Sequence, residues 1–256
     1  MDKLKTLSRF NFNIQDKRYI KGFYHYLKDP QINGPLFIYK PSSKIKLIIS
    51  EIKQAVFLFG EDLGYNLKLR IPDSDTIRFV KRANLNTKYK SRVLKEDIRG
   101  IFDPKTFLIY ISIDNQNKLF RENFSLAHSI NHELIHFISH KKIHIDKNDN
   151  SFRIVESGLR KINKYFFLDE AVTELTNLVI INKYWGRFPN LKMIQKNALS
   201  EISYVETLKT KKTLEQIAEK QGTSFEHILG IVQHDYLTGS RNIFTKLPKT
   251  SLITIR

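Results

Sequence analysis

The chain of 256 residues contains no cysteine and no apolar run that approaches the roughly 18 residues of a membrane span. The absence of cysteine excludes disulfides and thiolate metal sites, so a transition metal would have to be bound by His, Asp and Glu. The first residues, MDKLKTLSRFNFNIQ, carry positive charge but lack the apolar core of a signal peptide. We therefore expect a cytoplasmic protein, or one exported by a route without a classical signal peptide.

Acidic residues are in the minority, because 43 Lys and Arg face 26 Asp and Glu and give a net charge of +17. Such a surplus can favour nucleic acid, anionic membranes or acidic proteins. The lysines are spread along the chain, however, without a block of five or six consecutive basic residues. We attribute most of the charge to a composition rich in Lys, Asn and Ile. The expected partner is an acidic protein or peptide substrate rather than nucleic acid.

Glycine and proline are also sparse, with 10 and 7 residues, and no segment rich in Gly, Pro or Ser divides the chain. We therefore predict one domain over residues 41–256, preceded by an N-terminal extension, residues 1–40, of uncertain role. The hydrophobic content of 41% is sufficient for a globular core. The predicted fold class is α+β, with a mixed α/β half over about 41–145 and a helical half over about 146–256.

Local patterns of apolar, turn and capping residues predict the individual elements. In chain order these are a strand at 6–15, a helix at 17–30 ended by Pro30, a helix at 42–64 capped by Ser42, strands at 65–72 and 75–82, a hairpin within 100–114 that turns at Asp103-Pro104, a helix at 124–139 capped by Ser125, a helical region at 152–185, and further helices to about residue 235.

Five of the eight histidines stand at intervals of four in the stretch HSINHELIHFISHKKIH, residues 128–144. On a helix, this spacing turns a side chain by about 40° beyond a full circle, so successive histidines face the same way. The ends of the series differ by about 160°, so all five cannot bind one ion. Only the pair His132 and His136 has a carboxylate, Glu133, directly after its first histidine.

The resulting string HELIH matches the pattern H-E-x-x-H, which is expected roughly 0.01 to 0.02 times by chance in this composition. Two imidazoles at i and i+4 supply two of the usual three protein ligands of a catalytic zinc. Zinc lowers the pKa of its bound water to about 7, and Glu133 would take the proton of that water. His128, His140 and His144 are weaker candidates, and the last two fall at or beyond the predicted helix end.

A zinc site of this kind requires a third protein ligand, and the downstream candidates are Glu156, Asp169, Glu170 and Glu174. In the segment LDEAVTELT, Glu170 and Glu174 stand four apart on one helical face, and the small Ala171 would allow close packing against the histidine helix. A second carboxylate one turn on could accept the N–H of a zinc-bound imidazole and fix its tautomer. Two solvated carboxylates on an ordinary helix would give the same pattern.

HELIH followed by DEAVTE resembles the gluzincin group of zinc metallopeptidases, which have the thermolysin-like arrangement. The resemblance implies a zincin-like fold and a zinc metalloendopeptidase. It implies His132, His136 and Glu170 as zinc ligands, Glu133 as general base, and Glu174 as the partner of a ligand histidine. Residue 169 is Asp where Asn is common in that pattern. The hairpin strand before the histidine helix would hold an extended substrate along its edge.

Peptide hydrolysis also requires a donor to the developing oxyanion, commonly Tyr or His in similar enzymes. The sequence leaves four candidates open: Tyr165, Tyr184, Tyr204 and His227. An intact glutamate in HELIH argues against a purely structural zinc, because such a site has no use for a general base. Substrate and cleavage specificity are not indicated, and housekeeping, regulatory and effector-type proteases all remain open.

The alternative is a DNA-binding or regulatory protein. The stretch TLEQIAEKQGTSFEHILGIVQ, residues 213–233, has the apolar spacing and central glycine of a helix-turn-helix. The positions that would face DNA offer His227 and Gln233 but no Arg or Lys. We therefore favour a helical pair that completes the C-terminal half of a peptidase domain.

Overall fold

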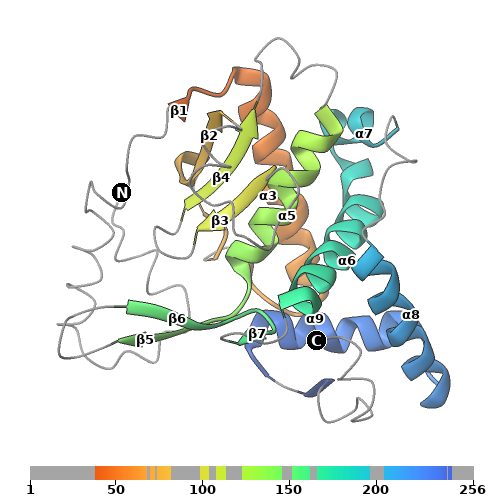
Figure 1. Ribbon diagram of the computed structural model, residues 1–256. Coiled ribbons are helices and arrows are strands. Elements are labelled where there is room, and N and C mark those ends of the chain that lie inside the picture. The colour runs from red at the N-terminus through yellow and green to blue at the C-terminus, as the bar shows by residue number, and fades with distance from the viewer. Residues whose placement is uncertain are drawn as a thin grey trace.

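The computed structural model describes residues 38–67, 70–72, 74–81, 99–103, 108–113, 123–145, 152–161, 166–196, 205–240 and 242–243 (Figure 1). The strands are β1 (Ile38–Tyr39), β2 (Ile77–Lys81), β3 (Gly100–Asp103), β4 (Leu108–Ile113), β5 (Lys141–Ile145), β6 (Phe152–Ser157) and β7 (Arg160–Lys161). The helices are α3 (Ser43–Asp62), α5 (Asn123–Ile138), α6 (Phe166–Tyr184), α7 (Pro189–Lys196), α8 (Val205–Lys220) and α9 (Phe225–Thr238), with short 3-10 turns at Ser74–Thr76 and Trp185–Arg187. The elements predicted at 6–15 and 17–30 lie outside the described residues.

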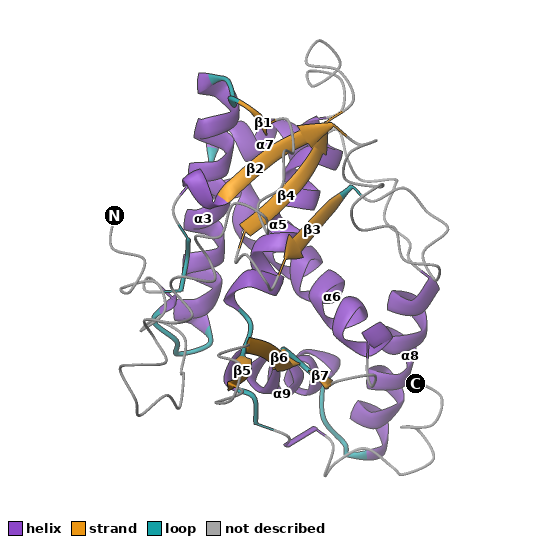
Figure 2. Cartoon of the chain, turned by 60° about the vertical axis from the view of Figure 1, so that its left-hand side comes forward, coloured by secondary structure: helices purple, strands orange, loops and turns teal. Residues whose placement is uncertain are grey.

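The larger sheet is mixed, with its strands in the order β1-β2-β4-β3. β2 runs parallel to β4, whereas β1 and β3 are antiparallel to their neighbours. The predicted hairpin pairing is confirmed, with Phe102 opposite Ile109. In the part of the chain that the structure describes, β3 is an edge strand, and it lies against α5 (Figure 2).

One face of this sheet packs against α3 and α5 and forms the main core. Ser42 caps α3 as predicted, because its Oγ accepts a hydrogen bond from the backbone N–H of Ile45. Alternate residues of β4 point toward the helices, and each buried branched side chain contributes about 1.5–3 kcal/mol. The buried residues of these elements include Ile48, Ile49, Ile52, Val56, Ile109, Ile111, Ile113, Ile130, Leu134, Phe137 and Ile138. This packing fixes the rotation of α5 about its axis.

The described residues of the segment 65–72 do not form the predicted strand. The backbone N–H groups of Arg70 and Ile71 both donate to the carbonyl of Leu67, at 2.8 and 3.0 Å, so the described part of the segment is a turn. Leu67 is buried directly over Gly60, where any Cβ would collide with it. The described apolar residues of the alternating pattern, Tyr65, Leu67 and Ile71, pack in or against the hydrophobic core from this turn. The second predicted strand is confirmed as β2.

The prediction for the segment after α5 is also wrong in part. Residues 152–161 were expected to be helical, but they form β6 and β7, which join β5 in a sheet of order β5-β6-β7. Gly158 makes the turn between β6 and β7 with φ of +56°, a conformation that β-carbon sterics disfavour in other residues. Helix α6 begins only at Phe166. His144 therefore lies in β5, and Ser125 lies inside α5 rather than at its cap.

From α6 onward the described residues form helices joined by turns, as predicted. α6 packs against α5 on one side and against α8 and α9 on the other (Figure 1). Mixed α/β structure followed by helices is thus confirmed as the fold class. None of the described helices is both long enough and apolar enough to cross a membrane.

Candidate metal centre

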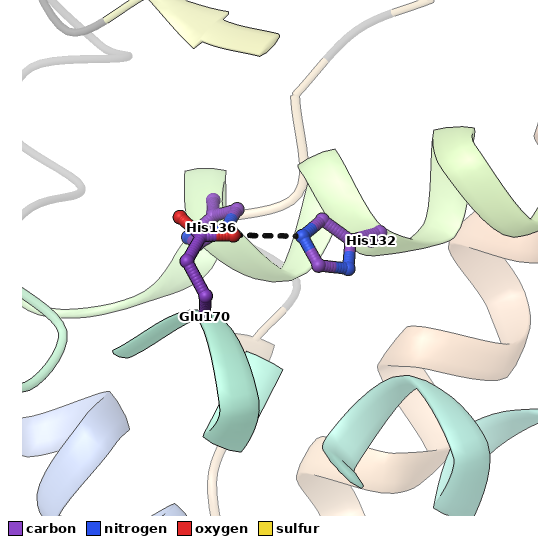
Figure 3. Close-up of side chains that lie close together, drawn as sticks. All are labelled: His132, His136 and Glu170. Atoms are coloured by element: carbon purple, nitrogen blue, oxygen red, sulfur yellow. Dashed lines mark hydrogen bonds and ion pairs between the residues drawn. The ribbon is translucent and has the colours of Figure 1, made fainter. Parts of the chain in front are cut away.

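Helices α5 and α6 bring together three of the residues that the sequence identifies. One ligand atom from each of His132, His136 and Glu170 lies within 4.8 Å of the others (Figure 3). Glu170 Oε2 is 3.4 Å from Nε2 of His132 and also 3.4 Å from Nε2 of His136. The Glu170 side chain is 39% exposed, so the group opens toward solvent.

These separations fit a tetrahedral metal ion. With metal–ligand bonds of about 2.0–2.2 Å, two ligand atoms of a tetrahedral zinc lie about 3.3–3.5 Å apart. Both contacts of Glu170 Oε2 fall in this range. Two imidazoles and one carboxylate are a donor set that suits zinc, and three protein ligands leave a fourth position open. The residues present therefore fit a zinc ion of the catalytic kind.

The electrostatics of the group also suit a cation. Burial alone would lower the pKa of His132 and of His136, but the Glu170 carboxylate raises both. The two imidazoles in turn lower the pKa of Glu170 below its usual range, against the opposing effect of its partly buried position. Glu170 is therefore ionised at neutral pH, and its negative charge lies between the two imidazole nitrogens that a metal would use.

Glu174 contacts the first histidine in the way that the sequence suggests. Its Oε2 lies 3.0 Å from Nδ1 of His132, and its Oε1 lies 2.8 Å from Nε2 of His128. Asn177 also donates to Glu174 Oε2, at 3.3 Å. Burial would raise the pKa of Glu174, but the hydrogen bonds from the two histidines lower it below its usual range. An ionised Glu174 accepts Nδ1–H of His132, so Nε2, which lies 3.4 Å from Glu170 Oε2, faces the position that a metal would take.

The second histidine is contacted by Tyr236 and Thr173, which the sequence did not single out, and by Asp169, which the sequence offered only as a candidate third ligand. Tyr236 of α9 places its hydroxyl 3.2 Å from Nδ1 of His136 and 2.7 Å from Oγ1 of Thr173. Asp169 Oδ2 is 3.6 Å from the same Nδ1, while its Oδ1 accepts from Leu159 N–H at 2.8 Å. Thr173 belongs to the quoted DEAVTE string, but nothing local to the sequence pointed to Tyr236.

Glu133 is buried and turned toward the edge strand. Its Oε2 accepts a hydrogen bond of 2.7 Å from the backbone N–H of Phe102 in β3. A Cβ at Gly100 would lie 2.8 Å from Cγ and 3.0 Å from Oε1 of Glu133, so the glutamate occupies the space that this glycine leaves. Burial raises the pKa of Glu133, and the neighbouring His132 and His136 partly oppose that effect. The carboxylate is thus close to both candidate ligands without bridging them.

A buried lysine donates hydrogen bonds to backbone carbonyl groups at the C-terminal end of α5. Lys141 Nζ donates to the carbonyl of His136 at 2.5 Å and to the carbonyl of Ser139 at 3.2 Å. Burial lowers the pKa of Lys141 to about 7 and raises the pKa of Asp169 to about 6. His140, at the end of the helix as predicted, donates its backbone N–H to the carbonyl of Tyr236 at 3.0 Å.

Of the four oxyanion candidates, the two that lie in the described residues are not brought to the group. Tyr165 and Tyr204 lie outside the described residues. Tyr184 donates its hydroxyl to Asp62 at 2.6 Å, at the far end of α6 and about 21 Å along the helix from Glu170. His227 is exposed in the first turn of α9. Neither of the two described candidates is therefore placed to act on a substrate bound at this site.

The predicted helical pair at 213–233 is present as the end of α8, a turn and the start of α9. Gln233, one of the two side chains that would have faced DNA, is 5% exposed and donates to Thr176 of α6 at 3.3 Å. The inner face of α9 thus packs on α6 and brings Tyr236 to the candidate metal centre.

No family model matches the chain, and no curated protein or solved structure is similar to it. Any functional assignment therefore depends on the side chains of this protein and on their chemistry.

Proposed function

We propose that this chain is a zinc-dependent metallopeptidase of the gluzincin type, which hydrolyses peptide bonds in a protein or peptide substrate. The observation that carries the proposal is Glu170 Oε2 at 3.4 Å from Nε2 of both histidines of the HELIH string. The glutamate of the same string lies beside this group on the edge strand side. His132, His136 and Glu170 would hold the ion, which when bound supplies a water of lowered pKa and a Lewis acid for the scissile carbonyl.

Glu133 is suited to the role of general base. The hydrogen bond from Phe102 N–H fixes Oε2, so Oε1 is the oxygen left to accept a proton from the attacking water. The same oxygen would then return the proton to the leaving amine. The short link to β3 holds the carboxylate in one orientation, which reduces the reorganisation needed during the reaction.

The edge of β3 is suited to binding an extended peptide next to this base. The N–H of Ser112 donates to the carbonyl of Arg99, so Arg99 faces β4. Because backbone groups alternate along an antiparallel strand, those of Gly100 face the opposite, open side. A peptide paired there by backbone hydrogen bonds would lie alongside Glu133. The net charge of +17 favours a substrate of acidic character.

The proposal is tested by incubating the zinc-loaded protein with a mixed peptide library and identifying new termini by mass spectrometry. We expect cleavage that a chelator abolishes and added zinc restores. Glu133→Gln should lose cleavage, whereas the matched variant Glu219→Gln, at an exposed position on α8, should retain it. Cleavage that persists in Glu133→Gln would contradict the assignment of the base. A zinc-loaded wild-type protein that cleaves no member of the library would contradict a general endopeptidase activity.

A further inference from the structure

We propose that Tyr236 is a positioning residue for His136, so that helix α9 contributes to metal binding. The proposal rests on the metal site proposed above and adds a residue that lies far from the HELIH and DEAVTE strings. Tyr236 is 1% exposed, and its hydroxyl contacts both His136 Nδ1 and Thr173 Oγ1. The hydroxyl is therefore buried at the one ring nitrogen of His136 that faces away from Glu170.

The direction of each hydrogen bond in this group follows from counting protons. Thr173 Oγ1 donates to the backbone carbonyl of Asp169 at 2.8 Å, and a carbonyl can only accept. Thr173 Oγ1 must then accept the proton of the Tyr236 hydroxyl across their 2.7 Å contact. With its own proton used, the Tyr236 oxygen is left as an acceptor toward His136 Nδ1 at 3.2 Å.

Only this order places a proton in each of the three hydrogen bonds that run from His136 through Tyr236 and Thr173 to the carbonyl of Asp169. If Tyr236 donated to His136 instead, the oxygens of Tyr236 and Thr173 would meet at 2.7 Å without a proton between them. This order of hydrogen bonds therefore requires that His136 carries a proton on Nδ1. A metal would then bind through Nε2, the atom that lies 3.4 Å from Glu170 Oε2, in place of any proton there.

The backbone around Tyr236 is tied to the end of the histidine helix. His140 N–H donates to the carbonyl of Tyr236 at 3.0 Å. The Arg70 guanidinium donates to the carbonyl of Leu237 at 2.6 Å and to that of Ile138 at 3.4 Å, so one cation joins the last turns of α5 and α9. These contacts hold the tyrosine ring at a fixed depth relative to His136, which a positioning role requires.

The two histidines are thus held by different chemistry. His132 donates to the ionised Glu174 at 3.0 Å. The nearest side chain at Nδ1 of His136 is instead the neutral phenol of Tyr236 at 3.2 Å, with the Asp169 carboxylate at 3.6 Å. A carboxylate accepts a hydrogen bond more strongly than a neutral hydroxyl. Removal of the Tyr236 hydroxyl should therefore weaken metal binding without abolishing it. The expected loss is about 10- to 100-fold in zinc affinity, the range typical of residues that orient metal ligands.

The test compares Tyr236→Phe with Tyr184→Phe in the full-length protein. Both variants remove one hydroxyl from a tyrosine that is 1% exposed and hydrogen-bonded. Tyr184, however, lies at the end of α6 that is remote from Glu170. Zinc affinity is measured by competition with a chromophoric chelator, and the visible absorption of the Co²⁺-substituted protein reports the ligand geometry. We expect Tyr236→Phe to bind zinc about 10- to 100-fold more weakly and to alter the Co²⁺ bands. Tyr184→Phe should leave both unchanged.

Thr173 provides a second route to the same result if Tyr236→Phe does not fold. Thr173→Val removes the acceptor of the tyrosine proton at nearly constant volume, and Thr173→Ser restores it. We expect weaker zinc binding in the first and wild-type binding in the second. Wild-type affinity and Co²⁺ spectra in Tyr236→Phe and Thr173→Val would overturn the positioning role and leave the metal site standing. A wild-type protein that binds neither zinc nor Co²⁺ would overturn both.

Discussion

The close approach of Glu133 to Gly100 in the edge strand gives a quantitative prediction. In Gly100→Ala the new Cβ would lie 2.8 Å from Cγ of Glu133, 3.0 Å from Oε1 and 3.2 Å from Cδ1 of Ile111. Carbon atoms in contact are ordinarily about 3.5–4.0 Å apart, so the Glu133 side chain has to retreat by about 0.7 Å or more. That displacement also stretches the 2.7 Å hydrogen bond from Phe102 N–H that orients the carboxylate.

A misplacement of about 1 Å at a reacting group can cost about 10²-fold in rate. We therefore expect Gly100→Ala to lower kcat by about 10- to 100-fold while zinc content and the unfolding temperature stay near those of the wild type, because neither ligand histidine is displaced directly. The assay is cleavage of the best peptide found in the library, followed at saturating substrate. Gly230→Ala is the matched control, since a Cβ at Gly230 on α9 meets nothing within 4 Å. Unchanged kcat in Gly100→Ala would refute the placement of Glu133 as the base.

Two further changes probe the surroundings of the ligands. Glu174→Gln removes the charge that accepts Nδ1–H of His132, so zinc affinity should fall by about 10- to 100-fold in chelator competition, and wild-type affinity would contradict that role. The second change, Lys141→Met, tests whether burial lowers the pKa of Lys141. The pKa of this lysine is about 7 in the folded protein and 10.5 as the ordinary value. Between pH 7 and 10.5 the lysine therefore holds its proton only in the unfolded protein. The metal-free wild type should therefore gain stability relative to Lys141→Met as the pH rises from 7 to 9.5, by up to about 1.4 kcal/mol per pH unit in urea unfolding. A stability difference that does not change with pH would show that Lys141 titrates normally.

The candidate metal ligands and Glu174 can be predicted from the sequence because they form two pairs, each with a four-residue helical spacing. His132 and His136 are one turn apart on one helix, as are Glu170 and Glu174 on another, so helical periodicity alone places each pair on one face. Packing of the two faces against each other then brings Glu170 to both imidazoles. The ligand and base roles of these residues stay predictions until metal and activity are measured.

The other contacts depend on packing between distant segments, which no local pattern encodes. Tyr236 reaches His136 only because α9 folds back across α6, and Gly100 meets Glu133 only because β3 lies at the sheet edge beside α5. The segment 152–161 was misjudged because short apolar runs suit a strand or a helix equally well. There the left-handed Gly158 was the available signal for a turn between two strands.

Metal analysis of the purified protein shows directly whether His132, His136 and Glu170 hold one zinc ion. Wild type, Glu170→Gln and Glu133→Gln are prepared side by side without chelators, and zinc is measured per chain. We expect about one zinc in the wild type, a large loss in Glu170→Gln and full retention in Glu133→Gln. A wild-type protein without zinc, or a Glu170→Gln variant that binds it as tightly as the wild type, would contradict the claim.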